Sequence, residues 1–243
     1  DTATVSDLIE AMGGPGAFEA EQHIRNAGRA AGDVVVSLDP DLFRTDERNG
    51  RLKRGEIVGL AGLEGSGQKE LLRALFRHPR KAGAVSGSRI RYVSGDRQKE
   101  GVFPLWSVLR NITIGRTARK SAWTPVSDAA MRPQLGEHAR KLRLDEGRLD
   151  SNILQLSGGN QQKALVARAL VDDFDILLLD DPTRGIDIGA KRDFYRLVAE
   201  IAASGKLVIW YSTEDLEFLE CDRVLVFSRG RIVRQLESGE IGE

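Results

Sequence analysis

Short apolar runs alternate with longer stretches of helical spacing from residue 33 onward. Several of these runs are apolar at every position, which is typical of strands that helices cover on both faces of a sheet. The predicted strands are Val34–Val36, Ile57–Leu60, Ile90–Val93, Ile176–Leu179, Leu207–Tyr211 and Val224–Phe227.

Amphipathic stretches separate many of the predicted strands and are expected to form helices. They are Glu70–Arg77, Asp128–Arg143, Gln161–Val171 and Ala190–Ala203. Gly205 follows the last stretch and is expected to end that helix, because glycine adopts a left-handed conformation without strain. Arg229 and Gly230 separate two β-like runs and predict a hairpin. This alternation predicts βαβ units and a mostly parallel sheet.

The first 32 residues have a different character from the rest of the chain. Val5–Met12 is expected to form a short helix, capped by Ser6 or Asp7 and ended by the glycines at 13, 14 and 16. Residues 17–32 are polar and rich in alanine, as expected of a linker or a loosely attached helix. The chain begins at Asp1 without a Met, so we expect it to be part of a longer protein.

Composition and charge narrow the possible classes of protein. The 243 residues include 41% hydrophobic and 30% charged residues, which is typical of a globular domain and argues against disorder. Equal numbers of basic and acidic residues (36 each) give no positive field for a nucleic-acid partner. The single Cys221 excludes an internal disulfide framework. Because no apolar run reaches the roughly 18 residues of a membrane span, any role at a membrane is expected to require a partner.

A glycine-rich segment directly follows the predicted strand Ile57–Leu60 and precedes a helix. Such a turn exposes backbone N–H groups beside a helix N-terminus and can cradle an anion, although some turns of this kind only allow close packing. In a working phosphate loop, G-x-x-x-x-G-K-[ST], the Lys contacts the β- and γ-phosphates and the hydroxyl binds Mg²⁺. Here Gln68 takes the Lys position and Lys69 takes the hydroxyl position.

Two further features carry candidate chemistry. Ser157, Gly158 and Gly159 precede a helix and can offer N–H and hydroxyl donors to an anion, or they can simply cap the helix. Asp180 and Asp181 follow the predicted strand Ile176–Leu179. Acids in this place can hold a Mg²⁺-bound water and orient an attacking water, or they can mark a strand that meets its loop.

In this order and spacing, the three features resemble the ATPase domain of ABC transporters, and the resemblance covers nearly all of residues 33–243. Its most specific motif is L-S-G-G-N-Q-Q at 156–162. The chain is more similar still to the C-terminal half of the tandem ATPase subunits of bacterial importers for ribose, galactose, xylose and similar sugars. The matching segments are Gly62–Glu70, Ser157–Lys163, Asp180–Lys191 and, as the link between the two halves, Thr4–Met12.

The resemblance implies an α/β P-loop fold with a mostly parallel core sheet, a small antiparallel β element and an inserted helical subdomain near residues 96–155. Residues 1–32 would be an inter-domain linker or the tail of a preceding domain, and residues 33–243 the nucleotide-binding domain. Gly101–Val108 is the candidate segment for receiving the permease, with a buried subdomain hinge as the alternative.

The resemblance also implies a site for ATP or ADP with Mg²⁺. The implied cofactor-binding residues are Gly62, Leu63, Glu64, Gly65, Ser66, Gly67, Gln68, Lys69, Glu70, Ser157, Gly158, Gly159 and Gln161. Asp180 is the implied metal ligand, at a weak or absent Mg²⁺ site. Asp181 takes the place of the water-orienting Glu and Thr213 that of the switch His, and Phe43 is the candidate adenine-stacking residue.

Further departures from the family pattern surround this site. The run Ser94–Gln98 stands where the family shows Glu-Asp-Arg. Without nucleotide, Lys69 is expected to pair with Asp180 or Asp181, or else to turn towards solvent.

All the altered residues belong to one ATP site, whereas the retained Ser157–Gly159 would serve the other. The resemblance therefore implies a degenerate second ATP-binding domain of a sugar importer. Its partners would be an N-terminal ABC domain of the same polypeptide, transmembrane permease subunits and, indirectly, a sugar-binding protein. It would lie at the cytoplasmic face of the bacterial membrane and bind no nucleic acid. The alternatives are a structural or regulatory module that no longer binds nucleotide, and a soluble ABC ATPase acting on ribosomes or DNA.

Overall fold

The computed structural model describes residues 32–43, 45, 50–117, 129, 131–132, 135, 142, 144–186 and 188–241. The helix expected over Val5–Met12 lies outside these residues, as do most of the residues of the helix expected over Asp128–Arg143.

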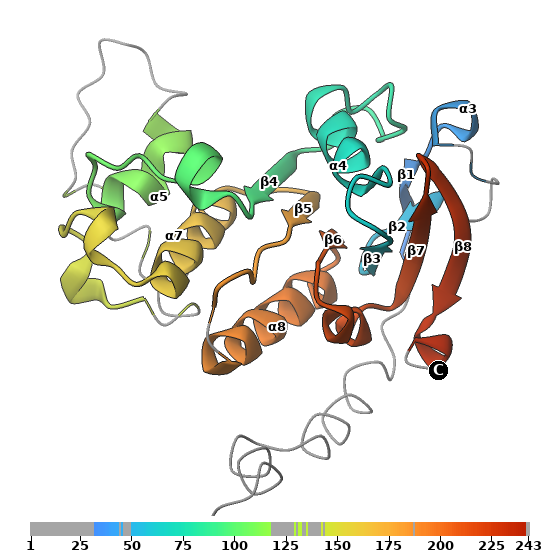
Figure 1. Cartoon of the computed structure of the whole chain (residues 1–243). Coiled ribbons are helices and arrows are strands. Elements are labelled where there is room, and N and C mark those ends of the chain that lie inside the picture. The colour runs from blue at the N-terminus through green and yellow to red at the C-terminus, as the bar shows by residue number, and fades with distance from the viewer. Residues whose placement is uncertain are drawn as a thin grey trace, which may run out of the picture.

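A six-stranded sheet forms the centre of the fold, with the strand order β4-β5-β6-β3-β7-β8 (Figure 1). The strands are β3 (Ile57–Ala61), β4 (Ile90–Ser94), β5 (Ile176–Asp180), β6 (Leu207–Tyr211), β7 (Arg223–Ser228) and β8 (Arg231–Glu237). All neighbouring pairs are parallel except β7 and β8, which form the predicted hairpin. Its turn places Arg229 and Gly230 at positive φ (49° and 76°), as a type I′ turn requires.

A second, two-stranded antiparallel sheet pairs β1 (Val34–Ser37) with β2 (Arg51–Lys53). The sequence predicted β1 but not β2, whose one buried residue, Leu52, lies between two charged residues. This sheet contributes Val35 and Val36 to the same apolar cluster as α4.

Helices cover both faces of the large sheet. The long helices are α4 (Gln68–Arg77), α5 (Val108–Thr117), α7 (Gly158–Leu170) and α8 (Ile188–Ala203). The shorter turns are α3 (Pro40–Phe43), η1 (Arg97–Gly101), η2 (Glu146–Arg148), η3 (Ile153–Gln155), η4 (Asp215–Glu220) and η5 (Ser238–Glu240). Figure 1 shows α4 and α8 on opposite faces of the sheet, and α5 beside α7 beyond β4.

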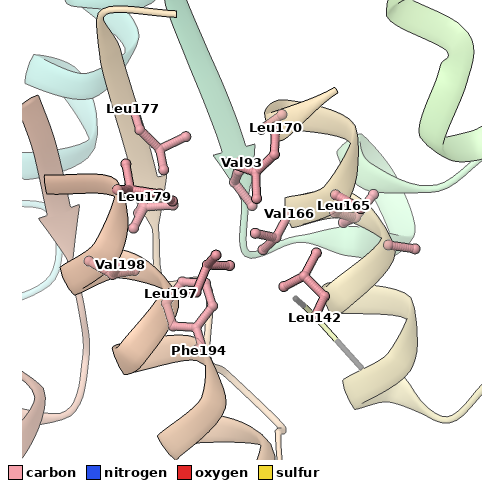
Figure 2. Close-up of a cluster of buried hydrophobic side chains, with 14 of the residues drawn as sticks. Val93, Leu142, Leu165, Val166, Leu170, Leu177, Leu179, Phe194, Leu197 and Val198 are labelled. Carbon is pink, nitrogen blue, oxygen red and sulfur yellow. The ribbon is translucent and has the colours of Figure 1, made fainter. Parts of the chain in front are cut away.

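The central strands divide the apolar core into two clusters. Successive residues of a strand point to opposite faces, so Leu177 and Leu179 of β5 belong to the cluster beneath α7 and α8, whereas Leu178 belongs to the cluster beneath α4. Figure 2 shows the first cluster, to which β4 contributes Val93, α7 contributes Val166 and α8 contributes Phe194. Burial on both faces explains why these strands read as continuous apolar runs.

Candidate functional site

The glycine-rich segment forms a tight loop between β3 and α4. Gly62, Gly65 and Gly67 all have positive φ (134°, 79° and 118°), a conformation that other residues rarely adopt. A Cβ atom on Gly62 would lie 2.4 Å from the Phe227 carbonyl oxygen, so the loop lies directly against β7. The β7–β8 hairpin supports it from outside, because the Gly230 N–H donates to the Ser66 carbonyl at 2.8 Å.

Gln68 is turned into this loop and is 1% exposed. Its side-chain amide donates to the Leu63 carbonyl at 3.2 Å, which closes the loop from within. An amide carries no charge, so the position where a phosphate loop has its Lys provides a neutral donor that is already engaged in an internal hydrogen bond.

Lys69 does not pair with the acids at the end of β5, and the expectation that it would is wrong. Its Nζ lies 3.6 Å from Glu64 Oε1 and 5.3 Å from the centre of the Tyr211 ring. The flexible stem of Lys69 lets the ammonium reach a carboxylate of the loop and an aromatic face in place of Asp180.

The carboxylate of Asp180 accepts a hydrogen bond from the Tyr92 hydroxyl at 2.5 Å. Asp180 is 5% exposed, and this burial raises the pKa of its carboxyl, while the Tyr92 bond and the charge of Lys69 act in the opposite direction. Burial and the nearby Asp180 also raise the pKa of Tyr92, which keeps its hydroxyl protonated as a donor. Sequence reasoning missed Tyr92, although its position in a strand neighbouring β5 could have pointed to it.

Asp181 is held by Thr213, the residue that the resemblance assigns to the switch position. The Thr213 hydroxyl lies 3.1 Å from both carboxylate oxygens of Asp181, and the Thr213 N–H donates to Oδ1 at 3.2 Å. Asp181 itself is 4% exposed and has a positive φ of 50°. The two residues proposed as replacements for Glu and His thus contact each other directly.

The serine-glycine-glycine segment begins α7. Ser157 is the N-cap, and its hydroxyl accepts from the Asn160 N–H at 3.4 Å, while Gln161 donates to the Leu156 carbonyl at 3.0 Å. A Cβ on Gly158 would lie 2.5 Å from a guanidinium nitrogen of Arg97, a contact that sequence reasoning did not find.

A cavity of about 620 Å³ lies between the phosphate loop, the end of β5 and the turn after β4. Its walls include the predicted residues Glu64, Lys69, Asp180 and Asp181, but not Ser157–Gly159. Five basic and five acidic side chains line it, so the lining has no net charge. A polyanion would therefore depend on backbone donors and local geometry more than on a positive field.

Comparisons with known proteins show the family to which a chain with this fold and site belongs. The family model for "ABC transporter" matches residues 45–184. The chain belongs to the ABC transporter family. It is 37% identical over 87% of its length to the ribose import ATP-binding protein RbsA 1 of Rhizobium johnstonii, and 35% identical over 87% to the xylose import ATP-binding protein XylG of Geobacillus kaustophilus. It covers 46% and 47% of those two proteins, about half of their length.

Solved ABC structures share the fold. A dimeric ATP-binding cassette with ADP and Pi bound superimposes with a TM-score of 0.65 at 22% identity, covering 77% of this chain and 87% of that one. This likeness confirms the predicted P-loop ABC architecture with its mostly parallel sheet.

The residues present in this ABC domain fit Mg²⁺ poorly. ABC ATPases in general bind ATP with Mg²⁺, but an ammonium replaces the hydroxyl ligand at Lys69, and Asp180 is engaged by Tyr92. Among the described residues, no cluster of three or more His, Cys, Asp or Glu side chains is placed to hold a metal ion. We therefore derive no chemistry from a metal at this loop.

Two other sequence expectations concern the surface of the ABC domain. Phe43, the candidate for adenine stacking, is 6% exposed and packs in the cluster beneath α4, so it has no free ring face and this expectation is wrong.

The segment Gly101–Val108, the candidate for receiving the permease, is exposed in part. Leu105 is 90% exposed and Phe103 41%, whereas Val108 is buried. No helix within the described ranges is long and apolar enough to cross a bilayer.

Proposed function

We propose that this chain is the second, catalytically impaired ATP-binding domain of a bacterial sugar importer. The observation that carries the proposal is Gln68, a neutral side chain buried in the phosphate loop at the position of the Lys that neutralises the β- and γ-phosphates. Without that charge, the transition state for phosphoryl transfer loses several kcal/mol of stabilisation, about tenfold in rate for each 1.4 kcal/mol.

The pair of Asp181 and Thr213 supports the same proposal. Asp181 reaches less far than a Glu by one methylene group, and its carboxylate is already bonded to Thr213. A threonine hydroxyl does not accept a proton near neutral pH, so it cannot act as the switch His does. Neither residue is therefore suited to activating a water.

The retained signature gives the domain its role in the importer. Ser157 is exposed and lies outside the cavity of its own phosphate loop, so it is available to an ATP bound by another domain. The similar import proteins are about twice as long as this chain. We infer that an N-terminal ABC domain of the same polypeptide supplies the competent phosphate loop and that Ser157–Gly159 completes its site.

The sugar class and the remaining partners follow from the relatives and from the exposed apolar surface. The similar proteins are named as import proteins for ribose and xylose, so we propose a monosaccharide as the cargo. Exposed Phe103 and Leu105 offer an apolar contact for transmembrane permease subunits, through which the sugar-binding protein would act. We therefore propose that the domain acts at the cytoplasmic face of the membrane.

The balanced charge of the cavity favours one second candidate, a structural or regulatory module that no longer binds nucleotide. Titration of the purified chain with a fluorescent ATP analogue separates the two, together with a phosphate-release assay. We expect saturable binding of the ATP analogue with negligible hydrolysis of ATP.

The double variant Gln68→Lys/Lys69→Thr restores the Lys and the hydroxyl of a working phosphate loop, so it should bind the ATP analogue more tightly. Turnover of the unaltered chain at about 1 s⁻¹ or faster contradicts the proposal, whereas absence of binding in both proteins supports the second candidate.

A further inference from the structure

A second cavity, of about 340 Å³, shares Arg73, Ser94 and Glu100 with the first and lies between α4, β4, the end of η1 and α7. Arg73 and Arg77 line it from α4 and Arg168 from α7, with Glu100 as the one acidic residue among the lining residues. These residues give the cavity two net positive charges, in contrast to the neutral lining of the phosphate-loop cavity.

Arg168 is partly buried, and its hydrogen-bond partners are all neutral groups. Its guanidinium donates to the carbonyls of Gly101 and Asn111, both at 2.7 Å, and to the Asn111 side-chain oxygen at 3.1 Å. No carboxylate of the described residues lies within 4.0 Å of it, and burial lowers its pKa to about 10. The guanidinium also lies 5.5 Å from the centre of the Phe103 ring. A partly buried cation whose partners are all neutral can accept an anionic ligand as its counter-ion.

The two arginines of α4 are also only weakly paired with acidic side chains. Arg73 has Glu100 at 4.0 Å, the limit of an ion pair, and Glu100 also accepts from the Ser94 hydroxyl at 3.0 Å. Arg77 is exposed and has no carboxylate within 4.0 Å in the described part of the chain. Because Arg73 and Arg77 are one helical turn apart, both guanidinium groups lie along the same face of α4.

Aromatic and apolar side chains complete the wall. The rings of Phe76 and Tyr92 lie 5.4 Å apart, and Leu165 of α7 also lines the cavity. Phe76 is 49% exposed, an unusual exposure for an aromatic ring on an otherwise well-packed helix. The cavity thus combines a cationic region with an apolar face.

We propose that this cavity binds a small phosphate monoester, with its phosphate among the arginines and its organic group against Phe76 and Tyr92. A phosphate monoester carries between one and two negative charges near pH 7, which matches the lining, and its oxygens accept the paired N–H donors of guanidinium groups. A carboxylate provides only one charge and fewer acceptors. A bound ligand would contact both β4 of the core and α7, the helix that begins at Ser157.

Calorimetric titration of the purified chain tests the proposal, with phenyl phosphate and ribose 5-phosphate as probes and with inorganic phosphate and ribose as comparisons. We expect saturable binding of at least one ester, weaker binding of inorganic phosphate and none of ribose. Arg77→Gln should weaken the ester about tenfold, because it removes one charge-assisted contact. Arg80→Gln is the matched control, since Arg80 is an exposed arginine that bonds to the Ser86 hydroxyl and does not line the cavity.

Three results overturn the proposal. The first is the absence of saturable binding of both esters up to about 10 mM, a range that includes weak ligands. The second is equal affinity in the Arg77→Gln and Arg80→Gln variants. The third is displacement of the ester by ATP in direct competition, which would assign the ligand to the phosphate-loop cavity.

Discussion

The hydroxyl of Thr213 lies 3.1 Å from both carboxylate oxygens of Asp181, so the two residues that the resemblance assigns to the switch-His and water-orienting Glu positions are hydrogen-bonded to each other. Thr213 follows the end of β6 and Asp181 follows β5, and these two strands are neighbours in the sheet. The contact joins the loops that follow these two strands, at a residue whose φ is positive (50°). These hydrogen bonds make the pair a structural link between the two loops.

Removal of the Thr213 hydroxyl should destabilise the domain. Thr213→Val keeps the shape of the side chain but leaves the buried Asp181 carboxylate with the backbone N–H alone, at an expected cost of about 1–3 kcal/mol. Urea denaturation followed by circular dichroism measures this. Thr213→Ser keeps the donor and should lose less than half as much. Equal stability of the valine variant and the unaltered chain would contradict a stabilising role for the hydrogen bond between Thr213 and Asp181.

Gly95 should tolerate no side chain. A Cβ atom there would lie 2.5 Å from the Asp180 carbonyl oxygen and 2.7 Å from that of Asp181, and backbone atoms cannot move aside easily. We expect Gly95→Ala to lose about 2 kcal/mol or more of stability, as overpacking does. Gly239→Ala meets no atom within 4 Å and should change stability by less than about 0.5 kcal/mol. If both variants unfold at the same denaturant concentration, the close approach at Gly95 is not real.

The buried carboxylate of Glu217 should be more important for stability than its exposed neighbour. It accepts from the hydroxyls of Thr183 and Ser212, both at 2.6 Å, and of Tyr195 at 2.9 Å. Glu217→Gln turns an amide NH₂ towards these donors and should cost about 2–3 kcal/mol.

The matched control for Glu217 is Glu214→Gln. Glu214 is half exposed and pairs with Lys191, which also lies 3.7 Å from Glu217, and a partly solvated pair of this kind contributes about 0–1 kcal/mol. Thermal unfolding of both variants measures the difference. A larger loss of thermal stability in Glu214→Gln than in Glu217→Gln would contradict a stabilising role for the buried hydrogen bonds of Glu217.

The carboxyl of Asp175 should make the free energy of unfolding depend on pH in the acid range. Hydrogen bonds from Arg89 and Arg54 hold its pKa at about 2, despite the opposing effect of burial. A lowered pKa in the folded state gives stability that is present above the unfolded value near 3.9 and is lost as the pH falls towards 2.

Asp175→Asn tests this dependence by urea denaturation at several pH values. Because Arg89 is half exposed and screened by solvent, we expect the variant to lose about 1–2 kcal/mol at pH 7. The difference should shrink between pH 4 and the lowest pH at which the chain stays folded. If the difference in the free energy of unfolding between the variant and the unaltered chain stays constant over this range, the lowered pKa of Asp175 does not contribute to stability.

The buried strands were the part of the fold that sequence alone predicted best. Burial on both faces makes Ile176–Leu179 and Leu207–Tyr211 apolar without a break, and both runs are strands within one residue of the expected ends. β2 and α5 were missed, because the few apolar residues of β2 and the Thr, Asn and Gly of α5 give weak local signals. Both elements depend on distant partners, β1 and α7 respectively.

In the site, the glycine and acid positions were predictable and the side-chain partners were not. Glycines at positive φ and acids at a strand end depend on local backbone geometry, which the motif encodes. The partner of Lys69 depends on which of several carboxylates its long stem reaches, and the contacts of Asp180 with Tyr92 and of Gly158 with Arg97 join segments far apart in the chain. No spacing rule predicts such contacts.

We propose that this domain supplies its signature segment, Ser157–Gly159, to another ATP site and does not hydrolyse ATP at its own. The most direct test measures ATP hydrolysis and sugar uptake by the complete ATPase subunit reconstituted with its permease, comparing Ser157→Ala with Gln68→Ala. Ser157→Ala removes a donor from the competent site and should lower both activities by about 100-fold or more. Gln68→Ala alters only the impaired loop and should leave both within about twofold of the unaltered subunit. Equal losses in the two variants, or a larger loss from Gln68→Ala, would contradict the account.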